Sequence, residues 1–225
     1  MSRKLELIKT EDGSHSLYVP ELKETYHSFH GAVQESRHVF MKQGLDFYYQ
    51  NNQPELINVL EVGLGTGLNA LLTAEWSVQN AYVKMTSLEA YPVESSIASQ
   101  LNYHTYIEDK QGKEWFDRIH SSEWEKTCAI HDTFDLLKNK LKVEEAELTS
   151  DFNVVFFDAF APNKQSELWE MQVLEKMYDA LTSSGVFVTY CAKGQLKRDL
   201  ATLGFEVETL AGPPGKKEMV RGIKK

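Results

Sequence analysis

The stretch "VLEVGLGTGLNALL" (Val59 to Leu72) joins an apolar run to a glycine-rich loop and then to a segment with the apolar spacing of a helix. Glycine is favoured where a backbone turns sharply or approaches a ligand closely, so Gly63, Gly65 and Gly67 predict a ligand-binding loop between a strand and a helix. The dinucleotide-binding fingerprint needs its third glycine three residues after the second, where this sequence has Leu68. The loop therefore predicts a different ligand.

Strand-like and helix-like segments alternate from about residue 55 onward, which predicts an α/β fold with a mostly parallel, Rossmann-like sheet and helices on both faces. "CAIHD" and "FDLLKNKL" continue this alternation as a strand followed by a helix. The last two strand-like runs, "FEVETL" and "EMVRGI", are separated only by "AGPPGKK". This spacing predicts an antiparallel C-terminal hairpin at the end of the sheet.

The first fifty residues are rich in aromatic and histidine side chains and show little periodicity. We expect residues 1–52 to form an N-terminal cap or extension and residues 53–225 to form the main domain. Such folds bind ligands at the carboxyl edge of the sheet. Whether the cap packs over that edge or only covers the side of the sheet stays open at this stage.

The composition is that of an ordinary globular protein of 225 residues with 42% hydrophobic side chains. No apolar run approaches the length of ~20 residues that a membrane span needs, and the N-terminus is charged, so we expect a soluble cytoplasmic protein. Cys128 and Cys191 are far apart and match no metal-ligand spacing, which favours packed or free thiols. The N-terminal histidines match no familiar metal site, and we expect no metal.

The net charge of −9 argues against non-specific binding of nucleic acid by the whole surface. The charge is nevertheless uneven, because the segment from Lys193 to the C-terminus holds eight Lys and Arg side chains against four Asp and Glu. This basic segment is either a site for a polyanion or an ordinary solvated surface.

Three acidic residues are expected at the carboxyl ends of successive strands around the glycine loop: Glu61, Glu89 and Asp132. Glu61 lies two residues before the first glycine, where a carboxylate suits a ligand with an ammonium group and disfavours a pyrophosphate. Glu89 is placed to accept hydrogen bonds from two ribose hydroxyls, and Asp132 to accept one from the amino group of adenine. Each acid alone would be explained as a helix cap. Together with the Gly-x-Gly-x-Gly spacing they predict an S-adenosylmethionine site.

Asp158 follows the buried strand-like run in "NVVFFDAFAP" (Asn153 to Pro162), beside the expected sulfonium of the cofactor. An amine in water is mostly protonated, with a pKa of ~10 like that of lysine, and its ammonium form has no lone pair to accept a methyl group. A carboxylate here can align the amine and take its proton. Phe160 would then flank a planar base, and Pro162 would stiffen the loop. The alternative is that Asp158 caps a helix or holds the cofactor's amino group.

Four segments resemble the methyltransferase domain of the MnmC family, which completes 5-methylaminomethyl-2-thiouridine at the wobble position of certain tRNAs. They are "QESRHVF" followed by "GLDF", then "EVGLGTGLNAL", "FFDAFAPNKQSELW", and the C-terminal "TYCAKGQLKRDLATLGFEVE" with "GPPGKKEMVRGI". The "DAFAPxK" and "GxxGKxEM" elements are far more specific than the glycine loop. The similarity extends from about residue 12 to the end of the chain.

The resemblance implies a class I methyltransferase fold, S-adenosyl-L-methionine as the methyl donor, and the aminomethyl nitrogen of a tRNA uridine as the acceptor. It implies that the three glycines, Glu89, Asp132 and Asp158 surround the cofactor and the reacting amine. It also suggests the segment Glu35 to Phe40 for the cofactor lid or the tRNA. Four basic residues are suggested for the same roles: Lys164, Arg198, Lys216 and Lys217. Tyr190, near the end of the next strand, is a second candidate for the general base.

One departure concerns domain content: the best-known members of the family carry an FAD-dependent oxidoreductase domain, whereas we expect this protein to be a stand-alone methyltransferase. Either the protein acts on a ready-made aminomethyl group, or a separate oxidoreductase supplies it. The sequence leaves the oligomeric state open. Rival interpretations are methylation of a small-molecule amine, aminopropyl transfer, which would need further acids after Asp158, and a catalytically silent cofactor-binding subunit, which would not need Asp158.

Overall fold

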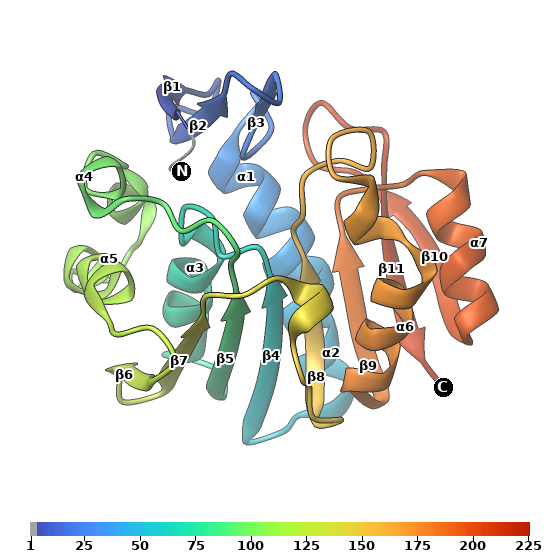
Figure 1. Ribbon diagram of the computed structural model, residues 1–225. Helices are drawn as coiled ribbons and strands as arrows, with labels where there is room; N and C mark the ends of the chain where they lie inside the picture. Colours follow the sequence, from blue (N-terminus) through green and yellow to red (C-terminus); the bar gives the residue numbers. More distant parts are fainter. Residues whose placement is uncertain (1–3) are drawn as a thin grey trace.

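The computed structural model describes residues 4–225, and an eight-stranded sheet forms the centre of that part of the chain (Figure 1). The strand order is β10-β11-β9-β8-β4-β5-β7-β6. The five parallel strands are β4 (Leu56–Val62), β5 (Tyr82–Leu88), β7 (Phe134–Asn139), β8 (Phe152–Phe157) and β9 (Leu181–Thr189). The three antiparallel strands are β6 (Thr127–His131), β10 (Phe205–Ala211) and β11 (Glu218–Lys224).

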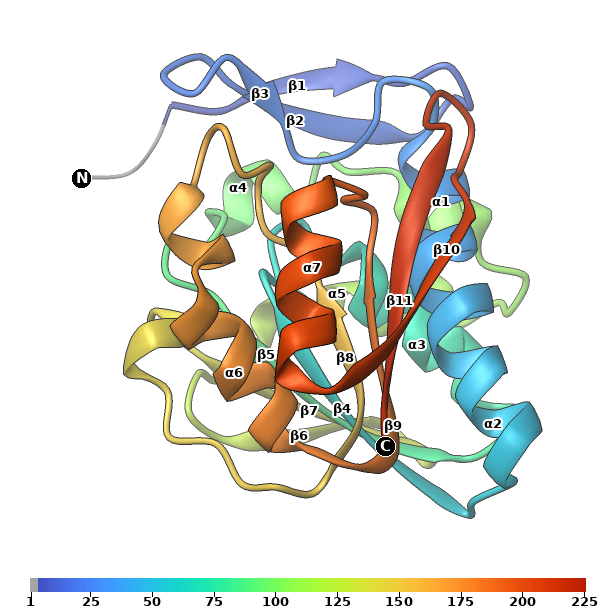
Figure 2. The same cartoon turned by 90° about the vertical axis from the view of Figure 1, so that its right-hand side faces the viewer.

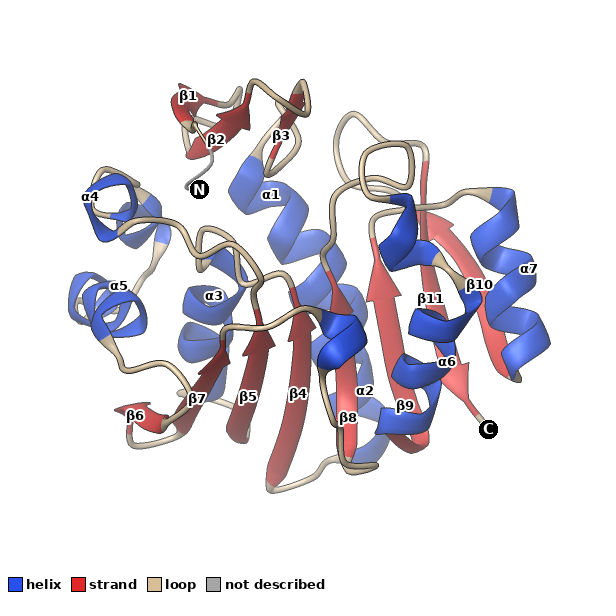
Figure 3. Ribbon diagram, in the orientation of Figure 1, coloured by secondary structure: helices blue, strands red, loops and turns tan. Residues whose placement is uncertain are grey.

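Helices cover both faces of this sheet, as the alternation of segments predicts (Figures 2 and 3). One face is covered by a continuous helical run and two further helices: α1 (Ala32–Ser36), η1 (Arg37–Asp46), α2 (Phe47–Asn52), α3 (Leu68–Ser77) and α5 (Gly112–Ser121). The other face is covered by α6 (Met171–Ala180) and α7 (Gly194–Leu203). Short helices complete the connections: α4 (Ser95–Ala98), η2 (Tyr103–Tyr106), η3 (Val143–Glu145) and η4 (Ser166–Trp169).

The two faces bury two separate apolar cores, because successive side chains of a strand point to opposite sides. In β8, Val154 and Phe156 belong to the core under η1 and α3, whereas Val155 and Phe157 belong to the core under α6 and α7. All four side chains are fully buried. The continuous apolar run of this strand is therefore explained by burial on both faces, as is typical of parallel sheets.

The C-terminal hairpin is confirmed, since β10 and β11 pair antiparallel and β11 also pairs antiparallel with β9. The helix expected at "FDLLKNKL" is wrong: Phe134–Asn139 form strand β7, which pairs antiparallel with β6 and parallel with β5. Its burial alternates, with Phe134, Leu136 and Lys138 buried. The buried positions have a period of two residues, and only two residues separate this strand from β6, so the pair is a tight hairpin.

A small second sheet of β1 (Glu6–Lys9), β2 (His15–Val19) and β3 (Glu24–Thr25) lies above the carboxyl ends of the parallel strands (Figure 1). The residues that follow it, 32–52, pack as helices on the main sheet, where Gly44 faces Phe156 and Val188. The expected division of the chain at residues 52 and 53 stays a prediction. Within residues 4–225, every helix is too short or too polar to cross a bilayer.

Replacing Phe156 by alanine tests the core beneath η1. Its ring is fully buried and lies 5.2 Å from the ring of Phe40, so the substitution leaves a cavity that the strands cannot close. We expect Phe156→Ala to lower the free energy of unfolding by about 3–5 kcal/mol in urea denaturation. Leu56→Ala is the control, because Leu56 lies at the start of β4 with 40% of its surface exposed. Equal losses for both variants would contradict this packing.

Candidate functional site

The glycine loop between β4 and α3 has a conformation that only glycine adopts easily. Gly63, Gly65 and Gly67 have φ angles of 93°, 50° and 74°. A Cβ atom on Gly63 would lie 2.7 Å from the carbonyl oxygen of Asp158, the first residue after β8. The loop therefore passes within contact distance of the end of the neighbouring strand, and its backbone is left open to a ligand.

A cavity of about 700 Å³ opens where the carboxyl ends of β4, β5 and β8 meet. Its walls come from the glycine loop, from Glu89 after β5, from Asp158 to Ala161 after β8, and from the segment 22–30 below the small sheet. This volume is in the range of small-molecule and cofactor sites. The open carboxyl edge of a parallel sheet is also where such folds bind ligands.

Glu89 has the position that the sequence suggests for a ribose contact. Its two carboxylate oxygens accept hydrogen bonds from the backbone N–H groups of Gly65 (2.9 Å) and Tyr91 (2.7 Å). These bonds fix the carboxylate on the cavity wall. The glycine loop and Glu89 thus form one hydrogen-bonded unit.

Asp158 lies on the cavity wall between the glycine loop and helix α3. Its Oδ2 accepts a hydrogen bond from Nδ2 of Asn69 at 2.9 Å. Burial raises the pKa of Asp158 to about 7, and the negative charge of Glu35 acts in the same direction, against the bond from Asn69 and the charge of Lys216. A carboxyl group with this pKa exchanges protons readily near neutral pH.

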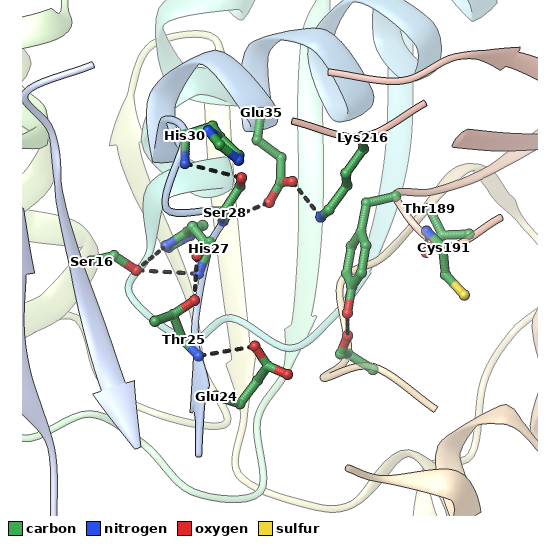
Figure 4. Close-up of polar contacts among 12 residues, drawn as sticks. Ser16, Glu24, Thr25, His27, Ser28, His30, Glu35, Thr189, Cys191 and Lys216 are labelled. Carbon is green, nitrogen blue, oxygen red and sulfur yellow. Dashed lines mark hydrogen bonds and ion pairs between the residues drawn. The ribbon is translucent and has the colours of Figure 1, made fainter. Parts of the chain in front are cut away.

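Glu35 and Lys216 meet at the side of the cavity, although they are far apart in the sequence (Figure 4). Glu35 is 5% exposed, accepts a hydrogen bond from the backbone N–H of Ser28 and forms an ion pair with Lys216. The Lys216 ammonium lies 3.8 Å from the centre of the Tyr190 ring. The cation is therefore held by a carboxylate and an aromatic face, which joins the C-terminal loop to the helical layer.

Tyr190, the second candidate for the general base, lines the cavity. Its hydroxyl donates a hydrogen bond of 2.8 Å to the carbonyl oxygen of Ala159. Burial raises the pKa of Tyr190 well above its usual value, and the charge of Asp158 adds to this shift. The hydroxyl therefore stays protonated and supports the loop after β8.

The expected adenine contact of Asp132 is wrong. Asp132 lies in the turn between β6 and β7, and β7 begins beside Val83 at the start of β5. The side chain is thus at the amino edge of the sheet, opposite Glu89, and it is absent from the cavity wall. The carboxyl end of β7 instead leads to residues 141–144, which line the cavity.

The position of Glu61 also does not fit the expected contact with an ammonium group of the ligand. Its side chain is fully buried and does not line the cavity, and its Oε2 accepts a hydrogen bond of 2.6 Å from Ser87. Burial raises the pKa of Glu61 to about 8. A direct bond from Glu61 to a ligand is therefore not part of this geometry.

The remaining predicted residues divide into two groups. Phe160 and Lys164 line the cavity: Phe160 packs edge-on against Tyr26 at 5.1 Å, and the Lys164 ammonium donates to the carbonyl oxygen of Leu22 at 2.8 Å. Lys164 therefore tethers the segment below the small sheet. The second group does not line the cavity, and consists of Pro162, Arg198 and Lys217.

Sequence reasoning missed Asn69, His27 and Tyr26. Asn69 is 3% exposed in the first turn of α3, and its polarity in an otherwise apolar helix face is the signal that could have identified it. Burial lowers the pKa of His27 to about 4, so the imidazole on the cavity wall is neutral. No cluster of metal-ligating side chains occurs within residues 4–225.

Replacing Gly63 by alanine tests the loop. The new Cβ atom would clash with the Asp158 carbonyl in a backbone conformation that alanine disfavours, so the loop has to move. We expect Gly63→Ala to weaken binding of S-adenosylhomocysteine by about tenfold or more in calorimetry. Gly194→Ala is the control, because a Cβ there meets only the flexible end of Arg198. Unchanged affinity in Gly63→Ala would contradict a cofactor at this loop.

The comparisons with known proteins agree with this site. Residues 102–225 match a family described as S-adenosyl-L-methionine-dependent methyltransferase. The tRNA 5-methylaminomethyl-2-thiouridine biosynthesis bifunctional protein MnmC of Burkholderia thailandensis is 27% identical, over 96% of this chain and 34% of that protein. The MnmC protein of Methylobacillus flagellatus is 25% identical, over 91% of this chain and 33% of that protein. The chain thus spans about a third of the length of these relatives.

Solved structures show the same fold. The crystal structure of MNMC2 from Aquifex aeolicus has a TM-score of 0.79 and 25% identity, and the match covers 100% of this chain and 71% of that one. A probable spermidine synthase from Corynebacterium glutamicum has a TM-score of 0.58 at 14% identity, which shows a shared fold alone. The glycine loop, the sheet and the family match lead to one conclusion: the chain belongs to the S-adenosyl-L-methionine-dependent methyltransferase family.

Proposed function

We propose that the protein transfers a methyl group from S-adenosyl-L-methionine to the aminomethyl nitrogen of 5-aminomethyl-2-thiouridine at the wobble position of tRNA. The observation that carries the proposal is the position of Asp158, a carboxyl group on the cavity wall beside the glycine loop. The names of the similar proteins from Burkholderia thailandensis and Methylobacillus flagellatus support the substrate.

The residues around the cavity suit the cofactor. The glycine loop would hold the amino-acid end, Glu89 the ribose hydroxyls, and residues 141–144 the adenine. The bound cofactor supplies an electrophilic methyl group on a sulfonium. A volume of about 700 Å³ leaves room beside the cofactor for an amine and the edge of a base.

Asp158 would bind the ammonium form of the amine, align it and remove its proton, which frees the lone pair. A catalytic base is most effective when its pKa is close to the working pH, and the pKa of Asp158 is raised to about 7. Glu35, buried and close enough to influence Asp158, adds to the negative potential that attracts a cation. Phe160 and Tyr26, packed edge to face on the same wall, offer apolar surface to the planar base.

The tRNA requires cations outside the cavity. The loop that carries Lys216 and Lys217 joins β10 to β11, and α7 with Arg198 packs beside β10. Arg198 is hydrogen-bonded only within its own helix, to Gln195, among the hydrogen bonds of the described residues. We propose phosphate contacts for Arg198 and Lys217, because phosphate binding needs Lys and Arg at only a few places. A separate FAD-dependent oxidoreductase is proposed as one source of the aminomethyl group.

The test is methyl transfer to two preparations of one tRNA, with and without the wobble aminomethyl group. We expect transfer to the first alone, and a loss of ~100-fold or more in kcat/KM for Asp158→Asn, which keeps the shape but cannot accept the proton. Tyr190→Phe is the control variant and should lose far less, since it removes only a bond to the Ala159 carbonyl. The rate should rise with pH through about 7 as Asp158 ionises.

Two results would count against this proposal. Transfer to neither tRNA, with S-adenosylhomocysteine still bound, would point to a small-molecule amine, which the net charge of −9 also accommodates. Full activity of Asp158→Asn would show that another group accepts the proton.

A further inference from the structure

Asn69 lies between two acids. On one side its Nδ2 donates to Oδ2 of Asp158 at 2.9 Å. On the other side its amide is close enough to Glu61 to influence the pKa of that carboxyl group, whose Oε2 accepts from Ser87 at 2.6 Å. Asn69 is 3% exposed and Glu61 is fully buried. A single amide therefore connects the acid of the cavity wall with an acid in the core.

Two oxygen atoms in this chain of contacts have no hydrogen-bond partner among the described residues: Oε1 of Glu61 and Oδ1 of Asn69. Both atoms are buried. If Glu61 is ionised, both atoms are acceptors and neither can satisfy the other, although buried polar atoms are nearly always paired. One proton on Glu61 satisfies both atoms, because a carboxylic acid donates where a carboxylate only accepts.

We propose that Glu61 is a neutral acid that donates a hydrogen bond from Oε1 to Oδ1 of Asn69 and so holds the Asn69 amide with its NH₂ group toward Asp158. An amide fixed in this way presents a donor to Asp158, which favours the charged carboxylate there. Glu61 is then a positioning residue for the methyl transfer proposed above, and this part of the inference rests on that function. It is not a direct ligand of the cofactor.

The surroundings decide which acid keeps the proton. The acids Asp158 and Glu89 oppose ionisation of Glu61, whereas Ser87 and Asn69 act in the other direction and lower its pKa. Burial is the largest cause of its raised pKa, about 8.

Asp158 differs from Glu61 because a cation, Lys216, is among the groups that influence its pKa. Glu35, Lys216 and Asn69 influence its pKa, and Tyr190 is close enough to be affected by its charge. Lys216 and Asn69 favour the ionised form of Asp158, whereas both charged groups that influence Glu61 are acids. This difference in surroundings favours the proton on Glu61 and the charge on Asp158.

The reversed arrangement predicts different chemistry. If Asp158 carried the proton and donated to Asn69, the amide would donate to an ionised Glu61, and an incoming amine would meet a neutral acid. If instead Glu61 were an ionised ligand of the cofactor's ammonium group, its charge would be essential for binding. Glutamine at position 61 separates these cases, since it keeps the donor and the shape and removes the charge.

The first experiment compares Glu61→Gln with Glu61→Leu in binding of S-adenosylhomocysteine and in methyl transfer. The glutamine NH₂ group can donate to Asn69 and its carbonyl can accept from Ser87, so we expect affinity and kcat within about threefold of the wild type. Leucine makes neither bond, and we expect a loss of about tenfold or more in kcat, with the pH dependence of Asp158 moved to higher pH. Equal impairment of both variants at neutral pH would overturn the proposal.

The second experiment needs no substrate and therefore separates failure of this inference from failure of the proposed function. A buried acid with a raised pKa contributes stability below its unfolded pKa, and that stability is lost as pH rises through the folded value. For Glu61 this window runs from 4.5 to about 8. The thermal midpoint of Glu61→Gln should rise relative to the wild type across this window and then level off.

Asp158 is present in both proteins, so its own titration largely cancels in this difference. A difference that stays constant with pH, or that turns against Glu61→Gln as pH rises, would show that Glu61 is ionised in the folded protein and would overturn the proposal. Asn69→Leu is a second variant, and it should reduce kcat whether Glu61 or glutamine is present.

Discussion

The close approach of two neighbouring strand ends is the constraint on which the rest of this structure depends. β4 and β8 are parallel, with Val62 opposite Phe157, so the residues that follow them, Gly63 and Asp158, come together. The contact leaves no room for a Cβ atom on Gly63. The same contact places the backbone of the glycine loop beside the carboxyl group of Asp158. In the proposed function, binding of the methyl donor and removal of the acceptor's proton both depend on this junction in the sheet.

The two ends of the chain complete the site from opposite directions. The segment below the small sheet is tied to the loop after β8 by Lys164, which donates to the Leu22 carbonyl. The C-terminal loop is tied to α1 by the ion pair of Lys216 with Glu35, and the His30 ring packs directly against Gly215. These contacts enclose a cavity that the sheet alone would leave open. They also surround Asp158 with both a carboxylate and an ammonium group, which together with burial set its pKa close to neutral.

Local patterns predict the parts of the fold that depend on local chemistry. Three features have sequence patterns that fit few other structures: the glycine loop, the strand before Asp158 that is buried on both faces, and the C-terminal hairpin. The prediction for Asp132 failed because the run after it, "FDLLKN", fits a helix or a strand. Only its pairing with β5 shows that it is a strand. Glu35 and Tyr26 contact Lys216 and Phe160, which are far away in the sequence, so the sequence alone does not reveal these pairs. Asn69 is marked only by its polarity on an apolar helix face, because its partner Asp158 is also distant in the sequence. Its position before the glycine loop marks Glu61 as a candidate, but its burial favours the neutral acid over the expected carboxylate.

The central claim is that Asp158 contacts the nitrogen that receives the methyl group. The most direct measurement is a crystal structure of the protein with S-adenosylhomocysteine and an anticodon stem-loop that carries 5-aminomethyl-2-thiouridine. The account predicts the aminomethyl nitrogen within hydrogen-bond distance of the Asp158 carboxylate, with the base against Phe160. An amine bound elsewhere, with Asp158 occupied by the amino group of the cofactor product, would contradict it.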